Sequence, residues 1–162
     1  MRIGILSDTH DEFERTRVAV RMMQYAGAEV IIHCGDLASP PIVRACAVLP
    51  FWFVFGNHDS DTVPVLRQAA IESGANCLGW GGIVELAGKR FGVTHGHMTT
   101  DVRRVLAEQP DYLLSGHSHI PNDTVVGTVQ RINPGALHRA DTFTVAILDV
   151  QTGDLTFLRI ER

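Results

Sequence analysis

The sequence predicts an α/β fold that becomes richer in strands toward its C-terminus. Three observations support this prediction. Up to about residue 108, short apolar runs alternate with amphipathic segments of helical period. Gly and Pro residues stand between these segments, where turns are expected. Beyond that point the chain carries β-branched runs with no helical pattern between them.

The N-terminal half is expected to contain three strands separated by helices. The first helix has clear end signals, because Asp11 can cap it, Glu14 follows as a capping box requires, and Gly27 comes after its last turn. Ser39 with Pro40 and Pro41 opens a second helix, which must end before Pro50. The strands are expected at 3–6, 30–32 and 51–55. The first helix is expected at 13–26 and the third at 63–73, where Gly74 closes it.

The C-terminal half is expected to contain one helix and six strands. Two short strands come first, the helix follows, and the remaining strands resemble a meander. The strands are expected at 83–86, 91–94, 112–115, 124–129, 144–148 and 155–160, and the helix at 100–108.

Length and composition limit the function classes. A chain of 162 residues is expected to form one domain, residues 1–162, around a single core. Hydrophobic residues make up 45% and charged residues 20%, the balance of a globular protein. The net charge of −4, without a long run of one sign, offers no basic stripe to long nucleic acid or to a membrane surface. No apolar run approaches the length of a membrane span.

The cysteines and the N-terminus predict a cytoplasmic protein. Cys34, Cys46 and Cys77 are odd in number and form no C-x-x-C pair, which favours a reducing compartment. The apolar stretch before Asp8 is too short for a signal peptide.

Polar residues that interrupt the pattern follow the ends of strands. The blocks are SDTH (7–10), HCGDL (33–37), GNHD (56–59), THGH (94–97) and SGHSH (115–119). They contain seven of the eight histidines, with His138 as the exception. Ligands bind at the carboxyl edge of open α/β sheets, so these blocks are expected to form one site.

The residue types in these blocks indicate a metal site. Carboxylates, imidazoles and one amide suit a divalent metal such as Mn, Fe or Zn. Asp8 and His10 are two residues apart, so on an extended chain they would point to the same face, and so would His117 and His119. Seven or more ligands exceed the needs of one ion. Two ions about 3.5 to 4 Å apart that share a carboxylate would use them all.

Together the five blocks resemble the calcineurin-like metallophosphoesterases, from Met1 to about Arg139. The short length, the HCGDL block and NPGA at 133–136 are similar to the small single-domain prokaryotic phosphodiesterase branch, which usually reads N-P-G-S where this chain has Ala136. The resemblance implies a four-layer α-β-β-α sandwich of two mixed sheets flanked by helices.

The resemblance also implies a dinuclear metal centre with Asp36 as the bridging ligand. Asp8, His10, Asp36 and His119 would hold one ion, and Asp36, Asn57, His95 and His117 the other. A hydroxide between the ions would attack phosphorus in line. Manganese is the first choice of metal, with iron, zinc and nickel as alternatives.

The resemblance implies a catalytic role for His58, which would stabilise the transition state or protonate the leaving oxygen. Many larger members of the family place an Asp where this chain has Ser39, so Asp59 is the candidate to orient His58. Ser39 also fits a helix N-cap, and so does Asp59.

The predicted substrate-binding residues are Asn57, His58, His97 and Arg139. His97 fits a hydrogen-bond partner of the ligands equally well. A surface loop is the alternative for Arg139 and His138, and His33 is interpreted as a packing residue.

The function implied by the resemblance is hydrolysis of a small phosphodiester, with a homodimer or homotetramer as the family-level expectation. Phosphomonoesterase activity is the first alternative. The second is a non-catalytic protein-binding scaffold, similar to the phosphoesterase-like subunit of retromer. The complete set of ligand residues and His58 favour the enzyme.

Overall fold

The computed structural model describes residues 1–161, and over this range the chain forms eleven strands, four α-helices and one 3-10 helix. The elements up to α3 are β1 (Arg2–Leu6), α1 (Phe13–Tyr25), β2 (Val30–His33), α2 (Pro40–Cys46), β3 (Phe51–Phe53), η1 (Asn57–Asp59) and α3 (Val63–Ser73). The elements after it are β4 (Asn76–Cys77), β5 (Gly81–Leu86), β6 (Lys89–Thr94), α4 (Thr99–Ala107), β7 (Tyr112–Leu114), β8 (Asn122–Val126), β9 (Val129–Asn133), β10 (Phe143–Asp149) and β11 (Leu155–Ile160).

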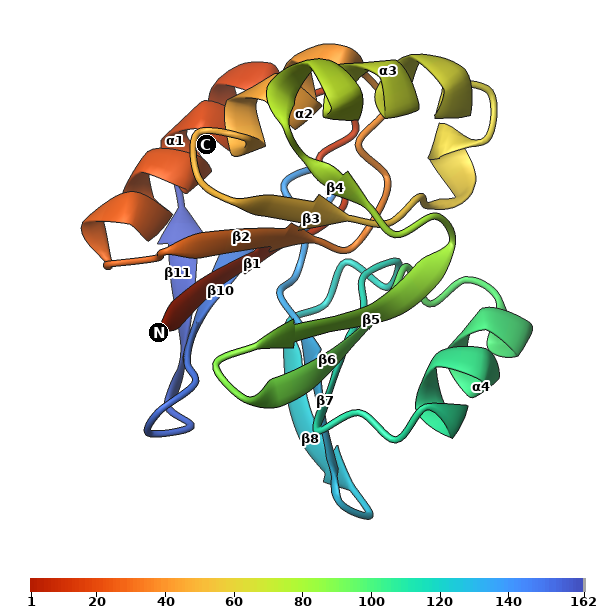
Figure 1. The fold of residues 1–162 in the computed structure, drawn as a ribbon. Helices are drawn as coiled ribbons and strands as arrows, with labels where there is room; N and C mark the ends of the chain where they lie inside the picture. The colour runs from red at the N-terminus through yellow and green to blue at the C-terminus, as the bar shows by residue number, and fades with distance from the viewer. Residues whose placement is uncertain (162) are drawn as a thin grey trace.

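The strands form two mixed sheets. The first sheet has the order β11-β10-β1-β2-β3-β4, and the second has the order β5-β6-β7-β9-β8. Helices α1, α2 and α3 cover the outer face of the first sheet, and α4 lies alone on the outer side of the second (Figure 1). The α-β-β-α sandwich with two mixed sheets that was predicted is therefore confirmed.

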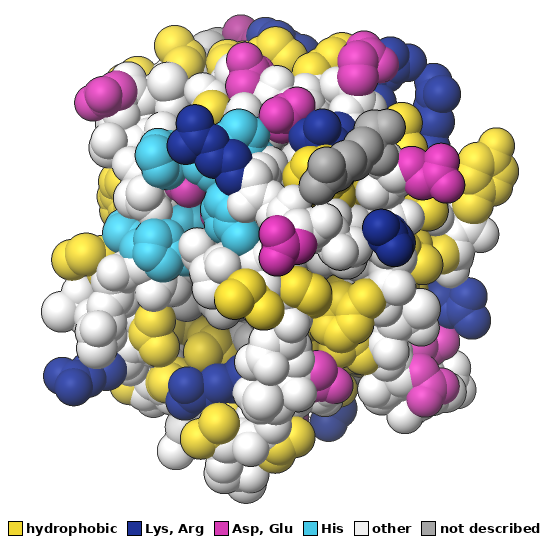
Figure 2. All heavy atoms as spheres, turned by 180° about the vertical axis from the view of Figure 1, so that it is seen from behind, with side chains coloured by type: hydrophobic (Ala, Val, Ile, Leu, Met, Phe, Trp, Pro, Cys, Tyr) yellow, Lys and Arg dark blue, Asp and Glu magenta, His cyan; other side chains and the backbone are white. Residues whose placement is uncertain are grey.

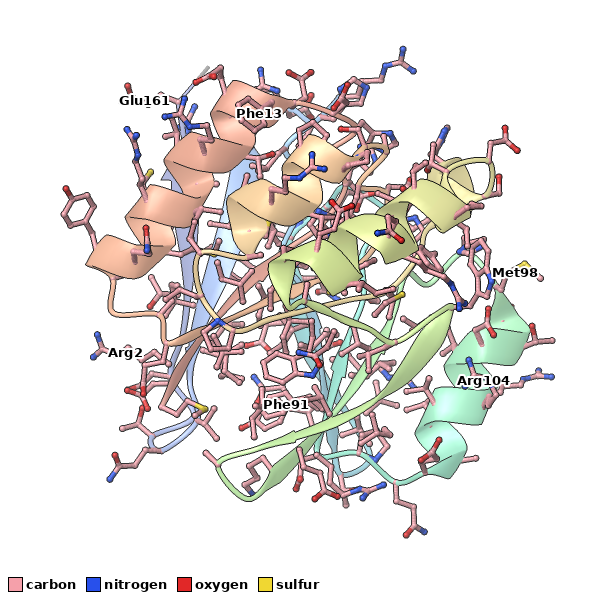
Figure 3. All side chains as sticks on the ribbon, turned by 45° about the horizontal axis from the view of Figure 1, so that its top comes forward. Arg2, Phe13, Phe91, Met98, Arg104 and Glu161 are labelled. Carbon is pink, nitrogen blue, oxygen red and sulfur yellow. The ribbon has the colours of Figure 1, made fainter. Side chains whose placement is uncertain are left out.

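Strands β1, β2 and β10 of the first sheet are buried on both faces, which explains their continuous apolar runs. In β2, Val30 and Ile32 face the second sheet, whereas Ile31 faces the helices. The space between the sheets is filled by apolar side chains such as Phe91, whose interior position Figure 3 shows. Burial of a large apolar side chain contributes about 1.5 to 3 kcal/mol, so both layers of this core stabilise the fold.

Two predictions for the C-terminal strands are wrong. The segment 124–129 is not one strand: it contains the end of β8, the turn at Gly127, which has a φ of 63°, and the first residue of β9. The strands also do not form a meander, because β9 inserts between β7 and β8, and β10 returns to the first sheet to pair with β1. Strand β4 was not predicted, and β3 ends at Phe53 rather than at Phe55.

The capping prediction for α1 is also wrong. The N-cap residue of this helix is Glu12, and no side chain caps the exposed N–H groups. The carboxylate of Asp11 instead accepts a hydrogen bond from the hydroxyl of Ser39. Ser39 does occupy the N-cap position of α2, but its side chain is engaged with Asp11 rather than with the helix backbone.

None of the helices within residues 1–161 is long and apolar enough to cross a bilayer. Cys34, Cys46 and Cys77 are all free thiols.

Candidate metal centre

The polar loops that follow five strands meet at one edge of the sandwich. Strands β1, β2 and β3 run parallel and so end at the same edge of the first sheet, and β6 and β7 run parallel in the second. Backbone hydrogen bonds of 3.0 Å join the loops, from Asp8 N–H to the Gly35 carbonyl and from Gly116 N–H to the His95 carbonyl. Figure 2 shows the histidines gathered on one face of the molecule.

Five of the predicted metal ligands have a left-handed backbone. They are Asp8 (φ 54°), His10 (42°), Asp36 (60°), His117 (70°) and His119 (60°). The explanation that residues two apart share a face of an extended chain is therefore wrong for both pairs, although each pair does lie at the site. Positive φ is unfavourable for residues with a Cβ, and such strain is concentrated at functional sites.

The carboxylate of Asp36 lies between two histidine rings. Its Oδ2 is 3.3 Å from Nε2 of His10 and 3.3 Å from Nε2 of His95, and its Oδ1 accepts the backbone N–H of His58 at 2.9 Å. Burial raises the pKa of Asp36, but its hydrogen bond to His95 and the charge of that ring outweigh burial and lower the pKa to about 2. Asp36 therefore offers one ionised oxygen to two sides of the site.

A second buried carboxylate, Asp8, completes the centre. Its Oδ1 is 3.1 Å from Nε2 of His119 and 3.9 Å from Nε2 of both His10 and His95. Burial raises the pKa of Asp8, but contact with His10 and the charge of His95 lower it below its usual value. Among residues 1–161, neither Asp8 Oδ1 nor His10 Nε2 has a hydrogen-bond partner, although both are buried.

Two histidine rings are fixed by backbone carbonyls. Nδ1 of His95 donates to the carbonyl of Cys34 at 2.8 Å, and Nδ1 of His119 donates to the carbonyl of Arg139 at 3.2 Å. A carbonyl can only accept, so Nδ1 carries the hydrogen in both rings, and a neutral ring then presents a lone pair at Nε2. This is the usual orientation of metal-binding histidines.

The ring of His95 consequently aims its Nε2 at oxygen atoms. This nitrogen lies 3.1 Å from Asn57 Oδ1 and 3.3 Å from Asp36 Oδ2. Burial lowers the pKa of His95, but the bond to Asp36 and the charge of Asp8 raise it above its usual value. A bound cation would accept the lone pair of this nitrogen together with those of the two oxygens, so the donor set fits a divalent metal.

Three overlapping groups of side chains have ligand atoms within 4.8 Å of one another. Asp8, His10 and Asp36 each belong to two of the three groups. The groups are Asp8, His10 and His119; His10, Asp36 and His58; and Asp8, Asp36 and His95.

His58 and His117 lie at the edge of this centre. The ring centroid of His58 is 4.8 Å from that of His10, and the ring of His117 is 5.2 Å from that of His95. Both side chains are exposed, so both are accessible to a substrate. The backbone N–H of His117 also donates to Asp8 Oδ2 at 3.0 Å, which ties the histidine pair to the first strand.

Asp59 supports the backbone around Asp36. Its fully buried carboxylate accepts four backbone N–H groups, those of Asp36, Leu37, Ala38 and Gly56, at 2.8 to 3.3 Å. Burial raises the pKa of Asp59, and these donors reduce the rise without cancelling it. Both carboxylate oxygens are thus occupied by backbone, which points to a positioning role rather than to orientation of the His58 ring.

The other two predicted substrate contacts have different surroundings. The ring of His97 lies 5.3 Å from His95 and 6.0 Å from His117, and burial together with these two rings lowers the pKa of His97. Arg139 is exposed and lies with His119 on a cavity of about 300 Å³. Both residues border the centre.

His138 lies at the centre although the sequence placed it in a surface loop. Its ring centroid is 4.7 Å from that of His10, and its Nδ1 is 3.0 Å from Oε1 of Glu12. The backbone N–H of Leu137 donates to the carbonyl of Asp8, which brings the NPGA segment onto the first loop. No local pattern around His138 signals this contact.

One buried polar residue that the sequence did not assign to the site, Asn133, holds two of its loops together. The amide of Asn133 donates to the carbonyl of Gly116 at 2.8 Å and to the hydroxyl of Ser118 at 3.0 Å. The N–H of Gly135 donates to Asn133 Oδ1, so the N-P-G turn and the histidine pair are one unit. The NPGA motif was the available signal.

His33 is buried, as its interpretation as a packing residue requires, and both of its ring nitrogens form hydrogen bonds. Nδ1 of His33 accepts the N–H of Gly35 at 3.1 Å, so the hydrogen is on Nε2, which donates to the hydroxyl of Thr9 at 3.1 Å. That hydroxyl donates in turn to the carbonyl of Asp36. Burial lowers the pKa of His33 to about 3.

Two glycines allow the loops to approach the carboxylates. A Cβ at Gly56 would fall on the carboxylate and backbone of Asp36. A Cβ at Gly116 would overlap Ser7 and the carboxylate of Asp8. Only glycine fits these two positions without displacing a predicted ligand.

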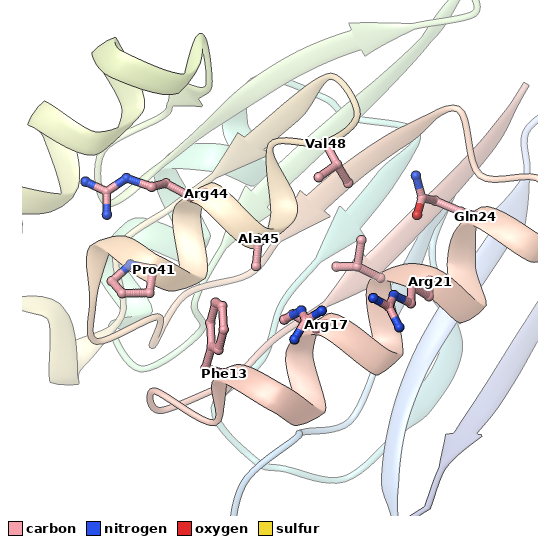
Figure 4. Close-up of a pocket in the computed structure, with 9 residues that line it drawn as sticks. Phe13, Arg17, Arg21, Gln24, Pro41, Arg44, Ala45 and Val48 are labelled. Atoms are coloured by element: carbon pink, nitrogen blue, oxygen red, sulfur yellow. The ribbon is translucent and has the colours of Figure 1, made fainter.

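A separate groove of about 400 Å³ lies between α1 and α2. Phe13 and Val48 give it apolar walls, and Arg17, Arg21 and Arg44 stand around it (Figure 4). None of the predicted site residues lines this groove, so it is distinct from the metal centre.

Comparison with known proteins agrees with this geometry. Residues 1–153 match the calcineurin-like phosphoesterase superfamily domain. Phosphodiesterase MJ0936 of Methanocaldococcus jannaschii is 28% identical over 156 residues, which cover 93% of this chain and 94% of that protein. A probable metallophosphoesterase of Methanothermobacter thermautotrophicus is 31% identical over 144 residues, which cover 84% of this chain and 77% of that protein.

Solved structures show the same architecture. A structure described as a novel archaeal phosphodiesterase has a TM-score of 0.88 at 26% identity and covers 99% of this chain and 100% of its own. Yfce, a phosphoesterase from E. coli, has a TM-score of 0.70 at 19% identity, with coverage of 99% and 100%. A single mutant of Vps29 from Entamoeba histolytica has a TM-score of 0.69 at 16% identity, with coverage of 100% and 99%. At these identities the last two similarities concern the fold alone.

Proposed function

Because the chain belongs to the calcineurin-like phosphoesterase superfamily, we propose that it is a metal-dependent phosphoric ester hydrolase, and specifically a phosphodiesterase with a dinuclear metal centre. The observation that carries the proposal is the position of Asp36, whose Oδ2 is equidistant, at 3.3 Å, from His10 Nε2 and His95 Nε2. One carboxylate oxygen between two histidine nitrogens is what a shared ligand of two ions requires.

The proposed ligands divide into two sets around Asp36. Asp8, His10 and His119 would complete one set, and Asn57, His95 and His117 the other. Nitrogen and oxygen donors without sulfur suit manganese, which we propose as the native metal, with iron, zinc or nickel as substitutes. Two such ions would activate a water molecule and neutralise charge on the phosphoryl oxygens.

The side chains around the ligands would bind and orient the substrate. We propose that the exposed ring of His58 holds a proton on a ring nitrogen and delivers it to the leaving oxygen, while its backbone N–H stays on Asp36. Asn57, His97 and the Arg139 guanidinium would contact the phosphate group. Asp59 contributes to catalysis by holding the backbone of Asp36 through its N–H acceptors, and so acts as a positioning residue.

The proposed substrate is a small phosphodiester. We also propose that residues 1–162 form a single domain. Support for one domain comes from the first sheet, whose strands contribute to both apolar clusters of the core. A cytoplasmic location, a homodimer or homotetramer, and the lack of a membrane or long nucleic-acid partner stay predictions. Phosphomonoesterase activity and a protein-binding scaffold are the competing functions, and the latter has only the shared fold of Vps29 in its favour.

The test combines metal content with hydrolysis. Gently purified protein is analysed for bound metals, and release of p-nitrophenolate from bis(p-nitrophenyl) phosphate is compared with release from p-nitrophenyl phosphate under each candidate metal. Asp36→Asn should lose metal and activity, whereas Asp61→Asn, a change at an exposed carboxylate, should retain both. Faster turnover of the monoester would replace the phosphodiesterase by a phosphomonoesterase. Protein that binds no metal and hydrolyses neither ester would favour the scaffold.

A further inference from the structure

A cavity of about 400 Å³ adjoins the metal centre on the second sheet. It opens between α4 and the outer face of β7, β9 and β8. Its apolar wall is formed by Val102, Leu113 and Val126. Figure 2 shows hydrophobic side chains and a basic side chain around a hollow next to the histidines. The volume is within the range of pockets that hold small organic ligands.

The cavity exists because α4 covers only part of this sheet. Helix α4 packs on β5 and β6, which leaves the adjoining strands without a covering layer. Leu113 of β7, Arg131 of β9 and Thr124 of β8 are direct cross-strand neighbours, so their side chains share the uncovered face. Arg131 therefore projects from the centre of the cavity floor.

Among the residues that the structure describes, Arg131 forms no ion pair with a carboxylate. Its Nε is buried and, among residues 1–161, has no hydrogen-bond partner, and no carboxylate lines the cavity. By contrast, Arg90 lies 2.7 Å from Glu85 and Arg104 lies 3.3 Å from Asp101. A buried donor without an acceptor is unfavourable, and a ligand that carries an anionic acceptor would satisfy it.

The cavity is continuous with the proposed site of phosphate binding. Gly116, His117 and Ser118 belong to its lining, and His117 is one of the proposed metal ligands. A phosphodiester held at the metals would therefore direct one of its two ester groups toward Arg131. The apolar wall and the single cation would select the chemistry of that group.

We infer that this cavity is the specificity subsite for one ester group of the substrate, and that it accepts a group with an apolar body and a terminal anion, such as a carboxylate or a second phosphate, paired with Arg131. The inference rests on the proposed phosphodiesterase function. It names the substrate class as phosphodiesters of which one ester group carries an additional negative charge.

The test uses matched p-nitrophenyl phosphodiesters that differ only at the end of the second ester group. One carries a carboxylate and the other an isosteric carboxamide, each on a short and on a long alkyl tether. The wild-type protein should hydrolyse the better-fitting carboxylate ester with a kcat/KM about tenfold higher than its carboxamide partner, the effect of one charge-assisted hydrogen bond. Arg131→Met should abolish this preference, while Arg131→Lys should keep part of it.

Three controls separate the explanations. Arg103→Met removes an exposed arginine of α4 that does not line the cavity, and it should leave the preference unchanged. Val126→Trp should raise KM for the long-tether esters, whereas Val125→Trp, on the neighbouring residue outside the cavity lining, should not. Far-UV circular dichroism and urea unfolding of Arg131→Met, compared with the wild type, would show whether the variant is folded.

Several outcomes would overturn the inference. The subsite is excluded if carboxylate and carboxamide esters are hydrolysed equally by the wild-type protein, or if the preference survives in Arg131→Met. A Val126→Trp variant that changes the oligomeric state without changing KM would assign the cavity to contact between copies of the chain. No metal-dependent hydrolysis of either ester would instead reject the proposed function itself.

Discussion

The backbone N–H of Asp36 donates to the carboxylate of Asp59 at 2.9 Å, so one buried aspartate fixes the backbone from which the other reaches the metal centre. Asp59→Ala would remove the acceptor of four N–H groups, and we expect the free energy of unfolding to fall by about 3 kcal/mol. Urea titration measures this loss, with Asp61→Asn as the surface control. If the variant kept wild-type stability and differed only in the pH dependence of kcat, the role of Asp59 would instead be to orient His58.

His58→Ala should reduce kcat and leave bound metal unchanged. The ring of His58 lies beside that of His10 but is exposed and is not a proposed metal ligand. Its loss therefore removes proton transfer and leaves every proposed metal ligand in place. We expect kcat to fall by about a thousandfold for an ester with a poorly stabilised leaving group, and by less for a p-nitrophenyl ester, whose leaving group needs no proton. Steady-state kinetics and metal analysis of the same sample check this. Equal losses for both esters, or loss of metal, would place His58 among the ligands.

Gly56→Ala should disrupt the metal centre. A Cβ at this position would occupy the space of the Asp36 carboxylate and backbone, so the Asp36 side chain must move. Metal affinity should fall by about a hundredfold, which titration of the metal-free protein measures. Gly82→Ala is the matched control, because a Cβ there meets neighbouring atoms at ordinary contact distances. Wild-type affinity in Gly56→Ala would mean that the loop tolerates the shift.

The buried His33 should make the stability of the metal-free protein depend on pH. Its folded-state pKa of about 3 lies below the unfolded value of 6.5, so the unfolded chain binds the additional proton between these values. The contribution is complete above about pH 6.5 and declines as the pH falls, by about 1.4 kcal/mol per pH unit. Chemical denaturation from pH 7 to about pH 4.5, compared between wild type and His33→Gln, measures the difference. Parallel curves would contradict it.

Metal should stabilise the sandwich as a whole. Asp8 and Asp36 follow strands of the first sheet, whereas His95 and His117 follow strands of the second. A metal at a hundred times its Kd should raise the free energy of unfolding by about 2.7 kcal/mol. Thermal unfolding with manganese and with a chelator checks this, and Asp36→Asn should abolish the difference. A stabilisation that persists in Asp36→Asn would locate the metal elsewhere.

The position of the site could be predicted from the sequence because strand ends are marked locally. Each of the HCGDL, GNHD and SGHSH blocks follows an apolar run, and the parallel strands bring such ends to one edge. The conformation of the ligands could not be predicted in the same way. Asp8 and His10 have a left-handed backbone, and their N–H groups donate to carbonyls of the loop after β2. No pattern of two or three residues encodes those contacts.

Residues brought in by long-range contacts were the ones missed. His138 lies beside His10 because Leu137 is hydrogen-bonded to Asp8, and this contact spans most of the chain. The order of the strands has the same origin, since β10 pairs with β1 as well as with β11, and it does not pair with β9, the strand before it in the sequence. The hairpin of β8 and β9 was different, because Gly127 is a local turn signal that the reading of a single strand overlooked.

The division of the proposed ligands between the two sheets has a consequence for the lifetime of the active state. Any slippage of one half of the sandwich over the other would separate Asp36 from His95 while leaving helices α1 to α3 seated on their own sheet. Hydrolytic activity would thus be lost early during gentle heating or mild denaturation, before helical content falls. The loss of activity would therefore report on the contact between the two sheets.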